Sequence, residues 1–134
     1  MNISDWKRTI YATLALPAYL AGSATRRRLA LRWLGAEPRG GRASFAAVPA
    51  FPLALLIWYL VGRITTFGFF WTEAGAAGSW GGPSLVGAWA VHFFGALGMT
   101  VVAMWALRPL TRWQVHPPEL VLYSDTRYPM EYRP

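Results

Sequence analysis

The sequence predicts an all-α membrane protein: a transmembrane helical hairpin, preceded by amphipathic or re-entrant helices and followed by an extended C-terminal tail. Three observations predict this fold class. Only 14 % of the 134 residues are charged and 54 % are hydrophobic, whereas water-soluble domains carry about 25 % charged residues. Two uncharged segments are each long enough to cross a bilayer, and the basic residues cluster beside them. The length suits one domain, and the absence of cysteine excludes disulfides and thiolate metal sites.

The hairpin is expected over residues 43–107, with helices at about 43–66 and 84–107. Residues 43–62 form an uncharged run of twenty residues, which at ~1.5 Å per residue spans a hydrocarbon core of ~30 Å. Residues 84–107 form a second uncharged run. A buried core helix of a soluble protein is the alternative, but it would need polar partner elements that the rest of the chain does not supply.

Residues 1–42 form a basic N-terminal segment. Its apolar run, residues 9–24, is interrupted by Pro17 and covers only ~24 Å as a straight helix. The following stretch, TRRRLALRWLG, places apolar and basic side chains on opposite helix faces, as in an interfacial helix. We expect residues 5–35 to form a re-entrant or surface-lying pair of short helices, with a complete third crossing as the alternative. The arginines expected to contact anionic lipid headgroups are Arg26, Arg27, Arg28 and Arg32.

The distribution of Lys and Arg predicts the orientation. Apart from Arg63, these residues lie in segment 1–42 and again from Arg108 onward, whereas the connecting loop, residues 64–83, contains none. Because cytoplasmic loops carry the excess of basic residues, the N-terminal segment and the tail, residues 108–134, are expected on the cytoplasmic side of the cell membrane. The tail is expected to be disordered or to lie extended on another protein. No nucleic-acid partner is predicted, because no recognition module accompanies the arginines.

A face of small residues runs along the second predicted crossing at helical spacing. Its members are Ser84, Gly87, Ala88, His92, Gly95, Ala96 and Thr100. Small residues let helix backbones approach closely in lipid, and Ser, Thr and His can add hydrogen bonds between helices. We expect this face to pack on the first crossing or on a partner subunit.

His92 is the one ionisable side chain within the second predicted crossing, and ionisable residues at membrane depth are candidates for function. It could ligate haem, relay a proton, bind a quinone headgroup or donate a hydrogen bond between helices. The other histidine, His116, lies too far along the chain to share a haem with it. The structural role is preferred, and a haem or quinone site shared with a partner subunit stays open.

A charged pair is predicted at the outer end of the hairpin. Arg63 ends the first apolar run and stays charged at any relevant pH, so it must reach the interface or find a carboxylate. Glu73 is the one acidic residue on that side. We expect the two to pair and to tie the outer loop to the helix end.

Three stretches carry a resemblance to a known family. SWGGPSLVGAWAVHFFGAL, the later LRPLTRW and the upstream RRRLALRWLG resemble the sensor-type transmembrane domain of actinobacterial membrane proteins. The resemblance covers about the first hundred residues. The residues that chiefly carry it are Trp80, Gly81, Gly82, Pro83, Gly87, Trp89 and His92. That domain occurs in histidine kinases and beside transporter genes, so the resemblance implies a role in sensing. No kinase, receiver or DNA-binding segment follows, so a signal would have to pass through a separate protein.

The sequence shows no phosphate-binding loop, no paired-carboxylate motif and no metal-ligand spacing, so the chain is not expected to be an enzyme. We expect a non-catalytic accessory subunit that packs on a larger membrane complex, such as a transporter or an energy-converting assembly, and stabilises or regulates it. A stand-alone sensor component is the first alternative. A small haem- or quinone-binding membrane subunit is the second.

Overall fold

The computed structural model describes residues 1–70 and 77–116, and for residues 66–70 it describes the backbone alone. The described chain is helical and contains no strand, which confirms the predicted all-α class. Its elements, in chain order, are α1 (Ile3–Leu20), α2 (Ser23–Leu34), the 3-10 helix η1 (Gly41–Ala46), α3 (Ala47–Phe70) and α5 (Leu85–Trp113). Among the described residues, two helical segments are long and apolar enough to cross a membrane: Gly41–Thr65 and Leu85–Trp113.

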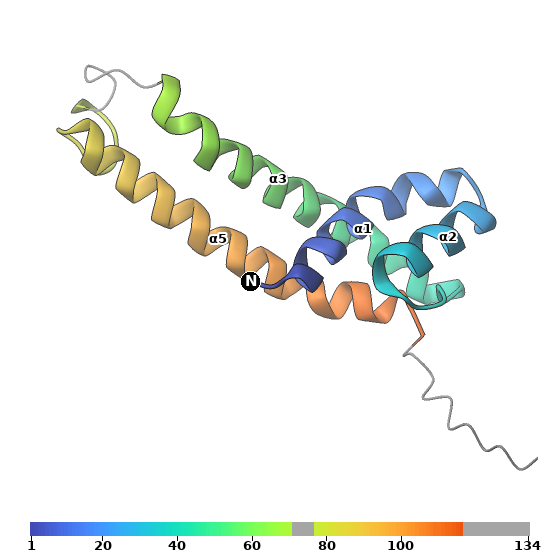
Figure 1. Ribbon diagram of the computed structural model, residues 1–134. Coiled ribbons are helices and arrows are strands. Elements are labelled where there is room, and N and C mark those ends of the chain that lie inside the picture. Colours follow the sequence, from blue (N-terminus) through green and yellow to red (C-terminus); the bar gives the residue numbers. More distant parts are fainter. Residues whose placement is uncertain (71–76, 117–134) are drawn as a thin grey trace, which may run out of the picture.

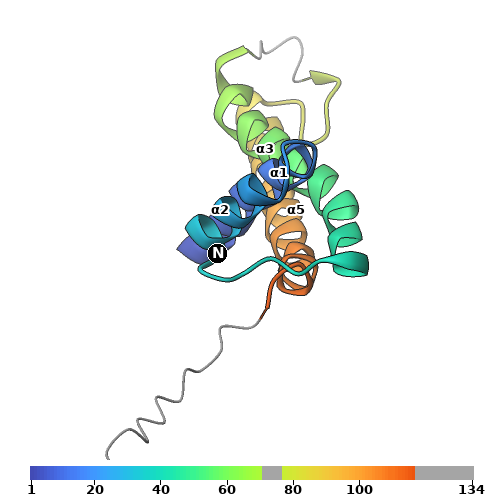
Figure 2. The ribbon, with the colours of Figure 1, turned by 90° about the vertical axis from the view of Figure 1, so that its right-hand side faces the viewer.

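The two long helices, α3 and α5, run antiparallel and side by side (Figure 1). The short helices α1 and α2 gather at one end of this pair, around the start of α3 and the end of α5 (Figures 1 and 2). α1 contacts α2, α3 and α5. The opposite end of the pair, formed by the end of α3 and the start of α5, stands clear of the short helices (Figure 1). The molecule therefore has a compact basic end and an extended two-helix end.

Small side chains let α1, α3 and α5 meet closely. One core cluster lies where these three helices converge and consists of Ala12, Ala50, Ala54, Ile57, Ala103, Met104 and Leu107. Four of its seven members are alanines, so the helix backbones themselves come near one another. The indole of Trp58 adds a link by donating to the Thr13 hydroxyl at 3.0 Å. The ring of Trp58 also lies 5.9 Å from that of Trp6.

A second core cluster fastens α2 and the end of α5 to α1. Its members are Tyr11, Ala15, Ala30, Ala36, Ala47 and Val115. α2 presents Ala30, with Leu29 and Trp33 beside it, as the helical spacing of the apolar residues predicts. α2 ends at Gly35, whose left-handed φ of 65° suits glycine at this position. The chain then pairs with the residues after α5, through the Arg39 amide to the Gln114 carbonyl at 2.8 Å.

Helix boundaries differ from the sequence prediction around the prolines. α5 continues through Pro109 to Trp113, six residues beyond the predicted end at 107, so the predicted tail begins later than expected. Proline removes one backbone hydrogen bond, but packing of Leu107 in the core holds this turn in place. The Thr111 hydroxyl also donates to the Leu107 carbonyl at 3.0 Å. Likewise, α1 runs through Pro17 as one helix, and α3 begins at Ala47 and reaches Phe70.

Both predicted short helices of the N-terminal segment are present, although α1 is longer than its apolar run because it has a capped start. The Asn2 side chain accepts from the Asp5 amide at 3.1 Å, and the Asp5 carboxylate accepts from the Asn2 amide at 3.0 Å. This reciprocal arrangement is a capping box, which satisfies two backbone donors at the helix start. It fixes Asp5 in the first turn of α1. The predicted extended tail beyond residue 116 lies outside the described residues.

Candidate functional site

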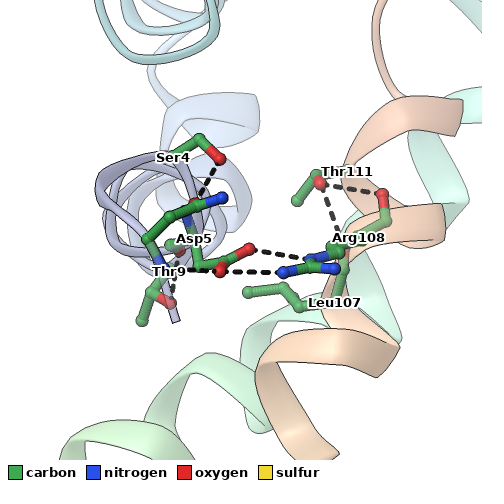
Figure 3. Close-up of polar contacts among 7 residues, drawn as sticks. Ser4, Asp5, Thr9, Leu107, Arg108 and Thr111 are labelled. Atoms are coloured by element: carbon green, nitrogen blue, oxygen red, sulfur yellow. Dashed lines mark hydrogen bonds and ion pairs between the residues drawn. The ribbon is translucent and has the colours of Figure 1, made fainter. Parts of the chain in front are cut away.

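An ion pair joins the first turn of α1 to the last turns of α5. The Arg108 Nε donates to Asp5 Oδ1 at 2.8 Å, and its Nη2 donates to Asp5 Oδ2 at 2.9 Å. Figure 3 shows the carboxylate on α1 and the guanidinium on α5 facing each other. The Asp5 side chain is 1 % exposed and that of Arg108 is 37 % exposed. The ion pair is therefore bidentate. Its carboxylate is removed from solvent, whereas its guanidinium is partly exposed.

The guanidinium of Arg108 lowers the pKa of Asp5 to about 2. Burial opposes this shift, and the amide of Asn2 adds to it. A charge-assisted bidentate bond favours the ionised carboxylate more than desolvation disfavours it. Asp5 is thus ionised at neutral pH and holds both the start of α1 and the end of α5.

The lowered pKa predicts that acid destabilises the protein. The pKa of Asp5 is about 2 in the folded chain against 3.8 for the unperturbed group. The pair therefore stabilises the fold above about pH 4, and this contribution is lost as the pH falls through about 2. The free energy lost is about 2 kcal/mol. The midpoint of thermal unfolding in detergent, measured across this range, should fall accordingly.

The exposed pair of Arg27 and Glu37 supplies the control for this experiment. Their side chains are 64 % and 46 % exposed, and exposed pairs contribute little to stability. The Arg27→Gln variant should therefore keep the acid-induced loss, whereas Arg108→Met should abolish it. An equal response of wild type and Arg108→Met to acid would show that Asp5 does not carry the effect.

Beside the ion pair lies a cavity of about 460 Å³ with basic walls. Its charged or titratable lining residues are Arg8, Arg39, Arg112 and His116. Apolar or neutral residues form the rest of the lining: Leu34, Ala36, Thr111 and Val115. We call this cavity the basic pocket. It is built by α1, the connection after α2, and the end of α5, so it exists only when these elements are docked together.

Carboxylates are scarce around the basic pocket. In the described part of the chain the acidic residues are Asp5 and Glu37, and neither lines the pocket. Asp5 is bound to Arg108. Glu37 accepts three hydrogen bonds of 2.7–2.9 Å from Arg27. Both acids are thus engaged by arginines outside the pocket, and the pocket keeps its positive charge.

The predicted face of small residues on α5 is buried in part. Ala88, Ala96 and Thr100 are buried, and α3 packs along α5. The Thr100 hydroxyl donates to the Ala96 carbonyl of its own helix at 2.8 Å, so this bond does not link two helices. Ser84 and Gly95 are exposed. The buried stripe continues beyond the predicted face to Ala103, Met104, Leu107 and Thr111.

Two members of the predicted face serve the start of α5 instead. Ser84 is the N-cap residue, and its hydroxyl accepts from the Gly87 amide at 3.1 Å. A side chain at Gly87 would collide with the backbone of Gly81, so glycine allows the preceding loop to lie against the helix. The sequence pattern of small residues did not distinguish this role from helix packing.

His92 lies half-buried on α5, with Nδ1 2.8 Å from the Ala88 carbonyl one turn earlier. That contact requires the proton on Nδ1. His92 lines an outer groove of about 510 Å³ between α3 and α5. The other members of this groove are Tyr59, Leu60, Arg63, Trp80, Val91, Gly95, Ala96 and Met99. Binding of haem or quinone at His92 stays a prediction.

Arg63 shares the outer groove with His92, a neighbourhood that sequence reasoning missed. Its guanidinium donates to the Tyr59 hydroxyl at 3.0 Å, one turn earlier in α3. Glu73, its predicted partner, lies outside the described residues. The pair between them therefore stays a prediction.

The arginines of α2 are less uniform than their predicted contact with lipid headgroups implies. Arg27 binds Glu37, and Arg26 lies over the Tyr19 ring at 4.9 Å. Arg28 and Arg32 are exposed. The pattern on one helix could not reveal Arg8, Arg39, Arg112 and His116, because these residues meet only through tertiary contacts.

The sequence matches no family model, and no significant relative was found among curated proteins or solved structures. The resemblance to the sensor-type transmembrane domain therefore stays a prediction. In the described residues no group of three or more His, Cys, Asp or Glu side chains is placed to hold a metal ion.

Proposed function

We propose that this chain is an integral membrane protein that acts as a non-catalytic accessory subunit of a larger membrane complex. The observation that carries the proposal is the exposure of apolar surface along α5. Only 17 % of its apolar window is buried inside the protein, and for the segment Gly41–Thr65, which contains η1 and most of α3, the share is 33 %. A core helix of a soluble protein would be mostly buried.

The exposed side chains are large and apolar. On α5 they include Val86, Phe94, Val102 and Trp105, each at least 65 % exposed. Bulky apolar side chains at such exposure need lipid or protein around them, because exposed apolar patches of this extent are rare on soluble monomers. Two antiparallel spans joined by an outer loop would satisfy this requirement.

The distribution of charge supports a defined orientation. The basic pocket and the arginines of α2 belong to the end where α1 and α2 gather. Residues 77–107 contain no Lys or Arg. Because basic residues are in excess on the cytoplasmic side of membrane proteins, the end with α1 and α2 faces the cytoplasm.

The outer groove favours an accessory subunit over a chain that is surrounded by lipid alone. It contains two ionisable side chains, Arg63 and His92, and intramembrane ionisable residues face protein or water rather than lipid. Gly95 lines the same groove and is exposed, with no atom within 4 Å of the position where a Cβ would stand. A helix of a partner subunit could approach the backbone closely there.

Filling this groove should release the partner. A Cβ at Gly95 would meet no atom of this chain within 4 Å, so Gly95→Leu is expected to insert normally. Its side chain should fill the groove and reduce the amount of co-purified partner by about tenfold or more. Gly98→Leu is the matched control. Gly98 is also an exposed glycine of α5 with open space around it, but it does not line the groove.

The measurement is gentle detergent extraction of the tagged chain, followed by quantitative mass spectrometry of the proteins that co-purify in fixed ratio. Alkaline carbonate treatment of membranes serves as the check on insertion. Recovery of the wild-type chain as a lone monomer would contradict the accessory-subunit proposal. Release of the chain by carbonate would contradict membrane integration.

A further inference from the structure

The basic pocket brings together three guanidinium groups, and among the described residues none of the three forms an ion pair with a carboxylate, although the nearby charge of Asp5 partly offsets that of Arg8. Arg8 is contributed by α1, Arg39 by the connection after α2 and Arg112 by the end of α5. The pKa of Arg8 is lowered, first by burial and second by the positive charge of Arg112. Guanidinium groups that lie close together in a partly desolvated pocket repel one another. An anion bound between them would relieve this repulsion.

The geometry of guanidinium groups selects the type of anion. Arginine presents planar, forked donors that bind carboxylate or phosphate oxygens in pairs. Three arginines and a histidine from separate elements surround one cavity of about 460 Å³, large enough for a phosphate group with its substituents. A phosphate diester with oxygens pointing in several directions fits this arrangement better than a planar carboxylate.

A second cavity continues from the first along α5. It shares Arg39 and Arg112 with the basic pocket and extends over about 820 Å³. Its apolar walls include Trp105 and Trp113, which are 70 % and 64 % exposed. The second cavity is lined by Arg39, Arg108 and Arg112 on its charged part and by Trp105, Ala106, Pro109, Leu110 and Trp113 on its apolar part. Two adjoining cavities with shared arginines and a tryptophan-lined apolar surface match a ligand with a phosphate headgroup and a hydrocarbon chain. Tryptophans are typical of this interfacial depth.

We propose that the basic pocket binds the phosphate of an anionic phospholipid, whose acyl chain lies along Trp105 and Trp113. The inference rests on the proposed membrane location and adds a specific lipid site to it. The site differs from the predicted headgroup contacts on α2, because its arginines come from three elements. Bound lipid would hold α1, the α2–η1 connection and α5 together at the cytoplasmic end.

The test compares two double variants that remove the same charge. Arg39→Gln with Arg112→Gln removes two of the three arginines of the basic pocket. Lys7→Gln with Arg42→Gln is the matched control, since these two side chains are exposed, do not line the pocket and are not among the arginines predicted to contact headgroups. Each full-length protein is reconstituted with mixed phosphatidylcholine and phosphatidylglycerol, extracted in mild detergent and analysed by native mass spectrometry for retained lipid.

We expect wild type and control to retain phosphatidylglycerol in preference to phosphatidylcholine, and the pocket variant to lose that preference by about tenfold or more. Equal preference in pocket variant and control would overturn the proposal. If the pocket variant unfolds, Arg39→Gln alone, which lies outside the helices, provides the same comparison with Arg42→Gln. Retention of lipid without any headgroup preference in wild type would overturn this site but leave the membrane location intact.

Free glycerol phosphate and inorganic phosphate distinguish a lipid from a soluble ligand. For a lipid site, neither should displace phosphatidylglycerol at millimolar concentration, and Trp105→Ala should weaken retention of the lipid. Displacement by either small anion, with no effect of Trp105→Ala, would assign the pocket to a soluble phosphate compound and overturn the lipid assignment.

Discussion

Replacing Arg108 by methionine is expected to destabilise the protein by about 3 kcal/mol. The change leaves the Asp5 carboxylate 1 % exposed and without its bidentate partner. Breaking a buried ion pair by removing one partner costs about 3–5 kcal/mol. The lower end applies here because Arg108 is 37 % exposed and the opened site admits water. The midpoint of thermal unfolding in detergent should fall by roughly 10 °C.

The two partners are not equivalent, and a double variant tests this. Asp5→Asn removes the charge from the buried side and leaves Arg108, which can turn toward solvent, so its cost should be smaller. In Asp5→Asn combined with Arg108→Met no buried charge remains unpaired. The double variant should therefore be more stable than Arg108→Met alone. A double variant less stable than Arg108→Met would show that the buried charge is not what makes the single change costly.

Asp5 also belongs to the capping box, so that contribution needs its own control. Asn2→Ala removes the side-chain cap of α1 but leaves the carboxylate of Asp5 bound to Arg108. Loss of an N-cap costs about 1 kcal/mol. The expected order of destabilisation is Arg108→Met greater than Asn2→Ala. The reverse order would indicate that capping, rather than the link to α5, is the main role of Asp5.

The fold class could be predicted because it depends on local composition. The runs 43–62 and 84–107 lack charge, and the structure places a long helix over each. Helix ends were less predictable. Pro109 is a local signal for a helix end, but the packing of Leu107 and the ion pair of Arg108 keep the helix intact through it. Tertiary contacts thus outweighed the local preference.

The candidate site was far less predictable than the fold. Asp5 and Arg108 are 103 positions apart, and no periodicity relates two such residues. The basic pocket combines Arg8, Arg39 and Arg112 in the same way. The sequence indicated which end of the helical hairpin is basic, because the excess of basic residues is obtained by counting them in each segment. It could not show which arginines converge, because convergence depends on how α1 docks against α3 and α5.

Replacing Ala54 on α3 by phenylalanine is expected to disturb the docking of α1. Ala54 is 0 % exposed and lies in the cluster shared by α1, α3 and α5, beside other alanines. A benzyl group has no room where helix backbones approach this closely, so the helices must separate. Overpacking a core costs about 1–3 kcal/mol and sometimes more, and we expect about 3 kcal/mol here. Leu55→Phe is the matched control, because Leu55 on the same helix is 46 % exposed.

The separation of α1 from α3 can be measured directly. The chain has no cysteine, so Thr13→Cys with Trp58→Cys, which replace a pair in hydrogen-bond contact, would report α1 docking through a short thiol crosslinker. Ala54→Phe should lower the crosslinking yield and the unfolding midpoint, whereas Leu55→Phe should change neither. Because Arg8 on α1 and Arg112 on α5 form one pocket only when α1 is docked, Ala54→Phe should also weaken lipid selectivity while leaving every arginine in place. Unchanged crosslinking and selectivity in Ala54→Phe would show that the alanine contacts do not assemble the basic pocket.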